Sequence, residues 1–174
     1  MEFEDRAIIH QYRSDLETEI RHWRFVNKAK SQRDFGPLAR WAEYWCQRKI
    51  EALGYHTALT ARNFPFDLWA WDDDGNAARI EVKFSLYFPF YRGGGRFQAH
   101  IRNHQHDLVI FIARNGRDWP FVIPAKAVPP TNLTIWTACP GDSKPWKPYL
   151  EAWDYLHQAI ASHRPVGWQL PLFQ

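Results

Sequence analysis

In the stretch Pro65–Lys83, PFDLWAWDDDGNAARIEVK, an acid follows a proline and a phenylalanine at position 67, and an acid and a lysine stand two positions apart at the end. In a β-strand, side chains at i and i+2 point to the same face. Glu81 and Lys83 are therefore predicted to project together, while Val82 points the other way into packing. This pattern indicates a site rather than a solvated sheet edge.

A turn signal separates the two acidic positions. The segment Asp72–Asn76 contains an Asp-Gly step, which supplies the positive-φ position that a tight hairpin turn requires. The flanking strands are predicted to pair antiparallel, which would bring Asp67 beside Glu81. Two carboxylates held close together repel each other unless a cation lies between them, and hard oxygen ligands of this kind suit Mg²⁺ or Mn²⁺.

This arrangement resembles the PD-(D/E)XK nuclease superfamily, whose signature is an acid after a proline or hydrophobic residue, a hairpin turn, and then acid-x-lysine. Asp67, Glu81 and Lys83 match the signature, although Phe66 interrupts the Pro-Asp step. The resemblance covers about residues 36–128. It implies an α/β (α+β) fold of the restriction-endonuclease type, in which helices flank a mixed β-sheet core, and a metal-dependent DNA endonuclease that hydrolyses phosphodiester bonds.

The resemblance also implies a role for each matched residue. Asp67, Glu81 and the Val82 carbonyl would hold one or two Mg²⁺ or Mn²⁺ ions against the scissile phosphate, and the ions would polarise the phosphate and lower the pKa of bound water. Lys83 would orient or activate the attacking water and neutralise charge in the transition state. The expected products carry a 5′-phosphate and a 3′-hydroxyl.

Two further catalytic candidates come from the same resemblance. Several branches of the superfamily, including the archaeal Holliday-junction resolvases, add a glutamate from the helix before the hairpin, and Glu43 fits that place as a catalytic or metal-binding residue. Gln98 follows the acid-x-lysine strand, where superfamily members often place a polar helper. The alternatives without a function are that Glu43 is a solvated surface residue and that Gln98 is an ordinary strand residue.

Basic residues suggest how a polyanion would bind. The net charge is only +3, so overall charge decides little. Arg92 and Arg96 flank three consecutive glycines and could clamp backbone phosphates, with Arg102 nearby and Lys28 and Lys30 toward the N-terminus. The predicted partner is double-stranded or branched DNA. Because one chain has one site and DNA has two strands, a homodimer or higher homo-oligomer is expected.

The chain of 174 residues is near the length of one domain. We expect a single nuclease-like domain with a helical extension over 1–33, a PD-(D/E)XK core over 34–128 and a C-terminal extension over 129–174. The expected helices and strands follow from apolar periodicity and turn signals. The helices are expected over 34–54 and 146–162, and the strands over 55–61, 64–72, 78–88, 96–101, 107–113 and 119–124.

Composition favours a folded protein in a reducing compartment. Hydrophobic residues make up 45% of the chain, and the two cysteines are too few for a disulfide framework. We expect no secretory leader and no membrane span, and hence a cytoplasmic protein. Two other functions remain open: a catalytically silent nucleic-acid-binding or assembly module with the same fold, and a protein-interaction surface formed by the ten tryptophans.

Overall fold

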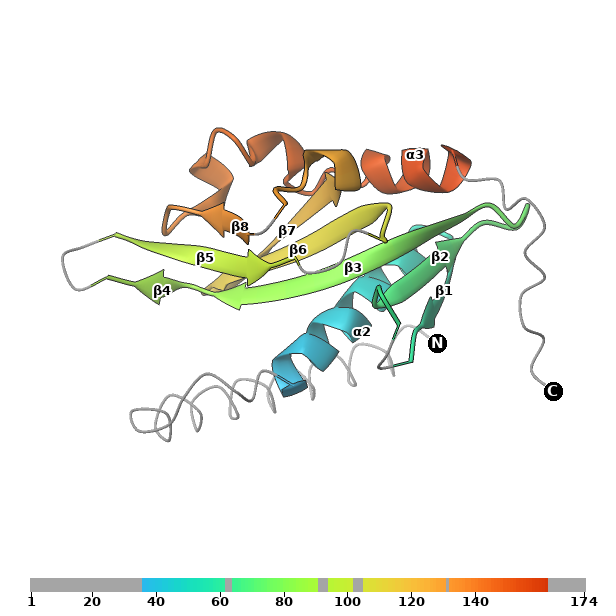
Figure 1. The fold of residues 1–174 in the computed structure, drawn as a ribbon, viewed down its shortest axis with the longest axis horizontal. Coiled ribbons are helices and arrows are strands. Elements are labelled where there is room, and N and C mark those ends of the chain that lie inside the picture. The colour runs from blue at the N-terminus through green and yellow to red at the C-terminus, as the bar shows by residue number, and fades with distance from the viewer. Residues whose placement is uncertain (1–35, 62–63, 91–93, 102–104, 131, 163–174) are drawn as a thin grey trace. The chain divides into compact units, whose positions relative to one another are not determined.

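The computed structural model describes residues 36–61, 64–90, 94–101, 105–130 and 132–162. The chain divides into two compact units, Met1–Leu38 and Ala39–Gln174. The second unit contains the strands, the last helix and most of the first described helix (Figure 1). The helical extension expected over 1–33 lies outside the described residues.

The helix α2 (Gly36–Ala52) supplies one apolar face to the core. Ala42, Cys46 and Ile50 recur every four residues and are fully buried, as expected for one stripe of a helix. The helix ends at Ala52, and Gly54 follows with a φ of 92°. Glycine adopts this left-handed conformation without a Cβ clash, so it ends the helix where the sequence predicts.

The larger sheet has the strand order β1-β2-β3-β6-β7. Neighbouring strands pair antiparallel except β3 and β6, which are parallel, so the sheet is mixed. Every residue of β6 but the last is buried, as the continuous apolar run predicts for a strand covered on both faces. The five strands are β1 (His56–Leu59), β2 (Leu68–Trp71), β3 (Ala77–Leu86), β6 (Leu108–Asn115) and β7 (Arg117–Pro124).

A smaller sheet has the strand order β4-β5-β8, with both pairs antiparallel. Its strands are β4 (Phe88–Pro89), β5 (Gly95–His100) and β8 (Asn132–Ile135). The remaining elements are three short 3₁₀ turns and the helix α3. They span η1 (Ala125–Ala127), η2 (Pro140–Asp142), η3 (Lys147–Tyr149) and α3 (Asp154–Ser162).

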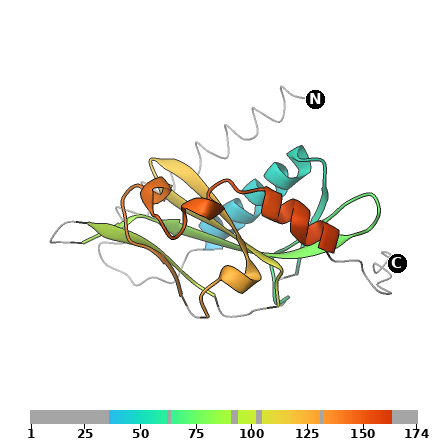
Figure 2. The same cartoon turned by 90° about the horizontal axis from the view of Figure 1, so that it is seen from above.

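The two faces of the larger sheet bury different partners. Ile80, Val82 and Ile110 pack with the apolar faces of α2 and α3, which lie on one side of the sheet (Figure 2). Val109 and Phe111 point to the other face and pack with β5 and β8. Because side chains alternate along a strand, each β3 residue belongs to one of these two faces.

The α+β class, the mixed sheet and the flanking helices confirm the predicted fold. The residues 96–101, predicted as a strand because apolar and polar positions alternate, form β5. The last helix was predicted from position 146 but begins at Asp154. Before it lie the 3₁₀ turn η3 and Glu151, whose φ of 51° interrupts a helix. Among the described residues, the helices are too short or too polar to cross a membrane.

Candidate active site

The hairpin formed by β2 and β3 brings Asp67 to Glu81. Asp72 oxygens accept hydrogen bonds from the backbone and side-chain amides of Asn76, each 2.8 Å long, and Gly75 takes a φ of 80°. This turn sets a register in which Leu68 pairs with Ile80, so the next positions are Asp67 and Glu81. The backbone N–H of Asp67 donates to the Ile80 carbonyl over 3.0 Å.

The Asp67 carboxylate reaches across to the neighbouring strand. Its Oδ2 accepts a hydrogen bond of 2.8 Å from the backbone N–H of Val82, the residue between Glu81 and Lys83. An N–H donor to a carboxylate is a charge-assisted bond, which fixes the side chain in place. The half-buried Asp67 is therefore anchored within the acid-x-lysine segment that the sequence predicted as its partner.

Glu81 and Lys83 lie on the same face of β3. Ile80 and Val82 belong to the core with α2, so the alternation of the strand turns Glu81 and Lys83 to the opposite face. The two side chains form an ion pair between Lys83 Nζ and Glu81 Oε1. Glu81 is almost fully buried and Lys83 keeps about a quarter of its side chain exposed, at 26%. The predicted common projection of the two residues is confirmed.

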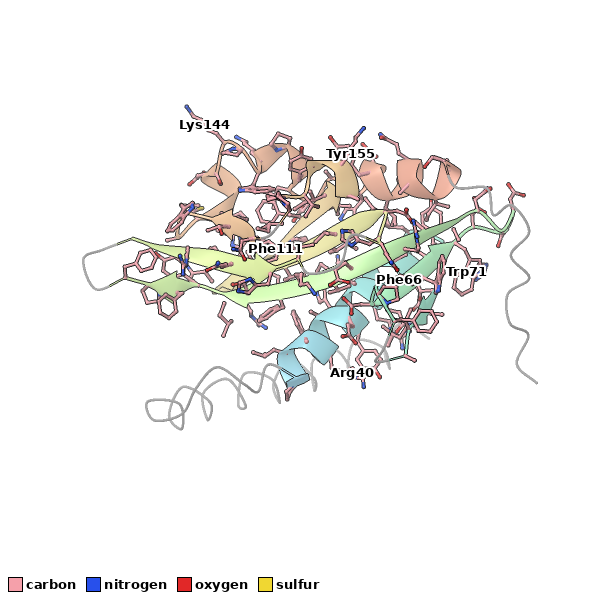
Figure 3. The ribbon with its side chains drawn as sticks, in the orientation of Figure 1. Arg40, Phe66, Trp71, Phe111, Lys144 and Tyr155 are labelled. Carbon is pink, nitrogen blue, oxygen red and sulfur yellow. The ribbon has the colours of Figure 1, made fainter. Side chains whose placement is uncertain are left out.

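Glu43 joins this group from α2. Burial raises the pKa of Glu43, and the nearby Asp67 carboxylate raises it further, while Arg40 and Lys83 act in the opposite direction. The Arg40 guanidinium lies 3.9 Å from Glu43 one turn away on the helix, where Figure 3 labels Arg40. Cys46 lies one helical turn after Glu43 on α2. Burial raises the pKa of its thiol well above the usual value, and the Asp67 and Glu43 carboxylates raise it further. The Glu43 carboxylate on α2 and the Asp67 carboxylate of the hairpin are therefore close enough to interact electrostatically.

The Glu81 carboxylate is incompletely compensated. Burial raises its pKa, the Lys83 ammonium lowers it, and the Asp67 carboxylate raises it again, so the pKa stays above the ordinary value. A buried acid beside a second acid favours a bound cation, because a cation stabilises both ionised forms. The donor set of two carboxylates and the Val82 carbonyl consists of hard oxygen atoms and fits Mg²⁺ or Mn²⁺.

The candidate metal site has no larger cluster of metal-binding side chains among the described residues. Within the described part of the chain, no group of three or more His, Cys, Asp or Glu side chains is arranged to hold a metal ion. Two side-chain carboxylates with one carbonyl therefore remain the candidate donor set. That Asp67, Glu81, Val82 and Glu43 bind metal, and that Lys83 takes part in catalysis, stays a prediction.

A second ion pair lies two residues before Glu81 on the same strand. Arg79 donates from Nε and Nη2 to the two carboxylate oxygens of Asp107, over 3.1 and 2.8 Å, and its backbone N–H donates to Oδ2 over 2.8 Å. The Asp107 N–H returns a bond of 2.8 Å to the Arg79 carbonyl. These four bonds join β3 to the residue before β6. Sequence reasoning missed this clamp, because the two residues are distant in the chain.

Gln98 lies on β5 beside the C-terminal end of β3, the strand that carries Glu81 and Lys83. Its backbone N–H donates to Ser85 Oγ over 3.0 Å, and Ser85 comes two residues after Lys83 on the same face of β3. The Ser85 hydroxyl therefore links β5 to the strand of the candidate site. This bond uses only the backbone of Gln98, and the helper role predicted for its side chain stays a prediction.

The predicted DNA-binding cations are only partly described. Arg96 lies on β5, where its guanidinium carbon stands 5.7 Å from the ring centre of Phe90 and 5.3 Å from that of Trp136. Arg92, Arg102, Lys28 and Lys30 lie outside the described residues. Sequence reasoning also missed the aromatic rings around Arg96, although the alternation Phe88-Pro89-Phe90 was a signal for them.

The mixed sheet and its flanking helices form a restriction-endonuclease-like fold, as the resemblance predicted. The structure is similar to that of a bacterial homing endonuclease, I-Ssp6803I, with a TM-score of 0.58. The alignment covers 71% of this chain and 93% of that protein, at 16% sequence identity.

A second match is the solved structure of Hjc, a Holliday junction resolvase from the archaeal hyperthermophile Archaeoglobus fulgidus. Its TM-score is 0.46 at 13% identity, and the alignment covers 67% of this chain and 93% of that one. The sequence itself matches no family profile and no curated protein. The similarity to the homing endonuclease therefore establishes the fold alone.

Proposed function

We propose that this protein is a metal-dependent DNA endonuclease that hydrolyses phosphodiester bonds at the site formed by Asp67, Glu81 and Lys83. One observation carries the proposal: Asp67 is anchored to the Val82 amide, between Glu81 and the Lys83 that pairs with it. A homing endonuclease shares the fold at a TM-score of 0.58, which supports the same class of reaction.

Asp67, Glu81 and the Val82 carbonyl would hold Mg²⁺ or Mn²⁺. When bound, the metal ion supplies Lewis-acid activation of the phosphate and of a water molecule. Asp67 is held in place by its bond to Val82, so its free oxygen is available without a search through rotamers. Glu43 would add negative charge from α2 and strengthen cation binding, directly or through water.

Lys83 has the properties of a residue that changes partners. It is partly exposed and pairs only with Glu81 among the interactions described for its ammonium group. If a divalent cation takes over the neutralisation of Glu81, the ammonium group becomes free to hold the attacking water and to stabilise the negative charge that develops on the phosphate. The proposed reaction leaves a 5′-phosphate and a 3′-hydroxyl.

The substrate is proposed to be duplex or branched DNA, cut by a homodimer or a higher homo-oligomer. Each chain offers one set of these residues, whereas a duplex has two strands to cut. Two-fold symmetry would place one site on each strand. Sedimentation of the protein with and without DNA would determine the number of chains.

Supercoiled plasmid and branched DNA provide the direct test. Wild-type protein is expected to nick or linearise DNA in Mg²⁺ or Mn²⁺ and to be inactive in EDTA. Asp67→Asn, which keeps the shape of the side chain but removes its charge, is expected to abolish cutting. Asp73→Asn is the matched control, because the side chain of Asp73 is 94% exposed and lies in the turn. Cutting that survives both EDTA and Asp67→Asn would refute the proposal.

The same experiment separates the main alternative. A silent nucleic-acid-binding module would bind DNA tightly in Ca²⁺ or EDTA and would cut none of the substrates in Mg²⁺ or Mn²⁺. Glu43→Gln refines the site further: a loss of cutting that higher Mg²⁺ concentrations restore would indicate that Glu43 strengthens metal binding. An unchanged metal requirement would remove Glu43 from the site.

A further inference from the structure

The smaller sheet carries an exposed group of aromatic rings around one arginine. Phe88 pairs with Arg96 across β4 and β5, and Trp136 directly follows Ile135, the partner of Phe97. Phe88, Arg96 and Trp136 therefore form one row across the three strands. Phe88 is 59% exposed and Trp136 65% exposed. We call these three residues and Phe90 the aromatic patch.

The rings of the aromatic patch touch one another and hold the cation. The Phe90 centroid lies 6.1 Å from that of Phe88 and 6.1 Å from that of Trp136. Arg96 lies over the Phe90 and Trp136 rings, at 5.7 and 5.3 Å from their centres. Stacking on rings leaves the guanidinium charge without a carboxylate partner in these contacts, so the patch combines flat apolar area with positive charge.

The patch lies on the face of the small sheet that is turned away from the core. Phe97, Ala99 and Ile135 pack in the core shared with β6 and β7, so alternation places Arg96 and Gln98 on the opposite face. The described structure thus buries one face of β5 and leaves the other with aromatic, basic and amide side chains. Exposed apolar clusters of this kind mark interaction surfaces more often than chance.

The charge of the surrounding sequence selects the kind of partner. No aspartate or glutamate occurs from Phe84 to His106 or from Trp119 to Gly141, the two segments that contribute the small sheet. A surface with arginine and no acid complements a polyanion. A second copy of the same patch would instead oppose arginine to arginine, so charge favours a nucleic acid over self-association.

The patch is connected to the candidate active site by the strand itself. β4 continues the course of β3 beyond Leu86 (Figure 1), and the Ser85 hydroxyl joins β3 to Gln98 on β5. At a rise of roughly 3.3 Å for each residue, Phe88 lies roughly 16 Å from Lys83 along the strand, and their odd separation of five positions places the two side chains on opposite faces.

We infer that the aromatic patch is a base-stacking surface that binds an exposed nucleobase of the DNA. The inference rests on the proposed nuclease function. Phe88 and Trp136 offer their faces to a base that is unpaired or unstacked, since ring stacking accepts any base. Arg96 holds the adjacent phosphate or stacks on the same base. The surface therefore favours DNA with a distorted or single-stranded segment over a regular duplex.

Binding without cleavage tests the inference independently of catalysis. DNA affinity is measured in EDTA with two labelled probes, a fully paired duplex and the same duplex with a short internal unpaired loop. Wild type is expected to prefer the looped probe. Trp136→Ala and Phe88→Ala are each expected to weaken binding of the looped probe about tenfold and to affect the paired duplex less. Arg96→Ala is expected to weaken both probes.

Tyr44→Ala serves as the matched control, because Tyr44 is a 47% exposed ring on α2 outside the small sheet. It is expected to bind both probes as wild type does. A fluorescent 2-aminopurine placed in the loop reports stacking directly: its emission should fall on binding of wild type and stay higher with the Trp136→Ala variant. Urea unfolding of each variant establishes that the fold is retained.

The remaining outcomes overturn one proposal or the other. Unchanged affinity of Trp136→Ala and Phe88→Ala for both probes refutes the patch, even if the protein cuts DNA. Loss of self-association in sedimentation, with DNA binding intact, assigns the patch to a second copy instead. Normal loop preference without any cutting in Mg²⁺ or Mn²⁺ supports the patch and refutes the nuclease function.

Discussion

Two ion pairs on β3 lie two residues apart and differ in almost every respect. Arg79 and Asp107 form a two-pronged bond between strands, supported by backbone bonds in both directions. Glu81 and Lys83 pair within one strand, and a second carboxylate, that of Asp67, adjoins them. In the first pair, the hydrogen bond with Asp107 raises the pKa of Arg79. In the second pair, burial and Asp67 leave the pKa of Glu81 raised.

The difference separates structural charges from functional ones. In the Arg79–Asp107 pair, both carboxylate oxygens accept hydrogen bonds from Arg79, and the pair holds β3 to the residue before β6. A buried carboxylate near a second acid carries negative charge that its protein neighbours do not fully neutralise, and a bound cation can neutralise it. The local excess of carboxylate over ammonium therefore marks the candidate active site more clearly than the presence of charge does.

Lys83→Met is expected to have the largest effect. Loss of the ammonium group should lower the rate of DNA cutting about 10²- to 10⁴-fold, the usual range for a group that activates water, while DNA affinity changes little. Single-turnover cutting in Mg²⁺ and binding in Ca²⁺ measure the two quantities. The control is Lys126→Met, an exposed lysine on η1. Equal losses of rate and affinity would make Lys83 a binding residue.

Asp107→Asn tests the Arg79–Asp107 ion pair. The variant replaces charge-assisted bonds to Arg79 with weaker ones, so the free energy of unfolding should fall by about 2 kcal/mol. Urea denaturation in EDTA measures the loss, with Asp73→Asn as the exposed control. The rate of cutting by the folded fraction should be close to that of wild type. A stable variant with lost activity would move Arg79 and Asp107 into the functional class.

Glu81→Gln should act in the opposite direction on stability. Because the ionised Glu81 is disfavoured in the fold, the neutral isostere is expected to raise the free energy of unfolding by about 1 kcal/mol in EDTA, as substitutions at strained functional sites often do. Mg²⁺ should raise the thermal midpoint of wild type but not of this variant. Destabilisation as large as that of Asp107→Asn would show that the pair with Lys83 is structural.

Arg40→Ala should have the smallest effect. The Arg40 side chain is 63% exposed and lies 3.9 Å from Glu43, and exposed pairs of this kind contribute less than about 1 kcal/mol. Urea denaturation and cutting assays should both give values near wild type. A small change in the Mg²⁺ concentration needed for cutting is expected only if Glu43 takes part in the site. A loss of activity comparable to Lys83→Met would extend the site along α2.

The sequence predicted the hairpin and the opposite faces of Val82 and of Glu81 with Lys83, because both depend on local rules: an Asp-Gly turn and two-residue alternation. It also predicted β5, whose apolar and polar residues alternate. The start of α3 was misplaced because apolar periodicity continues through η3, while Pro148 and the left-handed Glu151 prevent a helix there.

Features that depend on distant pairing were not predictable in the same way. Arg79 meets Asp107 only because β3 and β6 run parallel, and Arg96 meets Trp136 only because β5 pairs with β8. Neither pairing has a signal in the local sequence. The proximity of Glu43 to Asp67 likewise required the packing of α2, and the resemblance to a superfamily supplied it rather than the residues alone.

The register set by the Asp72–Asn76 turn has a consequence for how the hairpin can vary. A shift of one residue between β2 and β3 would exchange the two faces of β3, burying Glu81 and Lys83 under α2 and turning Val82 outward. An inserted or deleted residue in this hairpin therefore preserves the chemistry only if the turn absorbs it before Leu68 meets Ile80. Insertions and deletions should therefore be tolerated at the tip of the hairpin, whereas those within β2 or β3 should abolish the site.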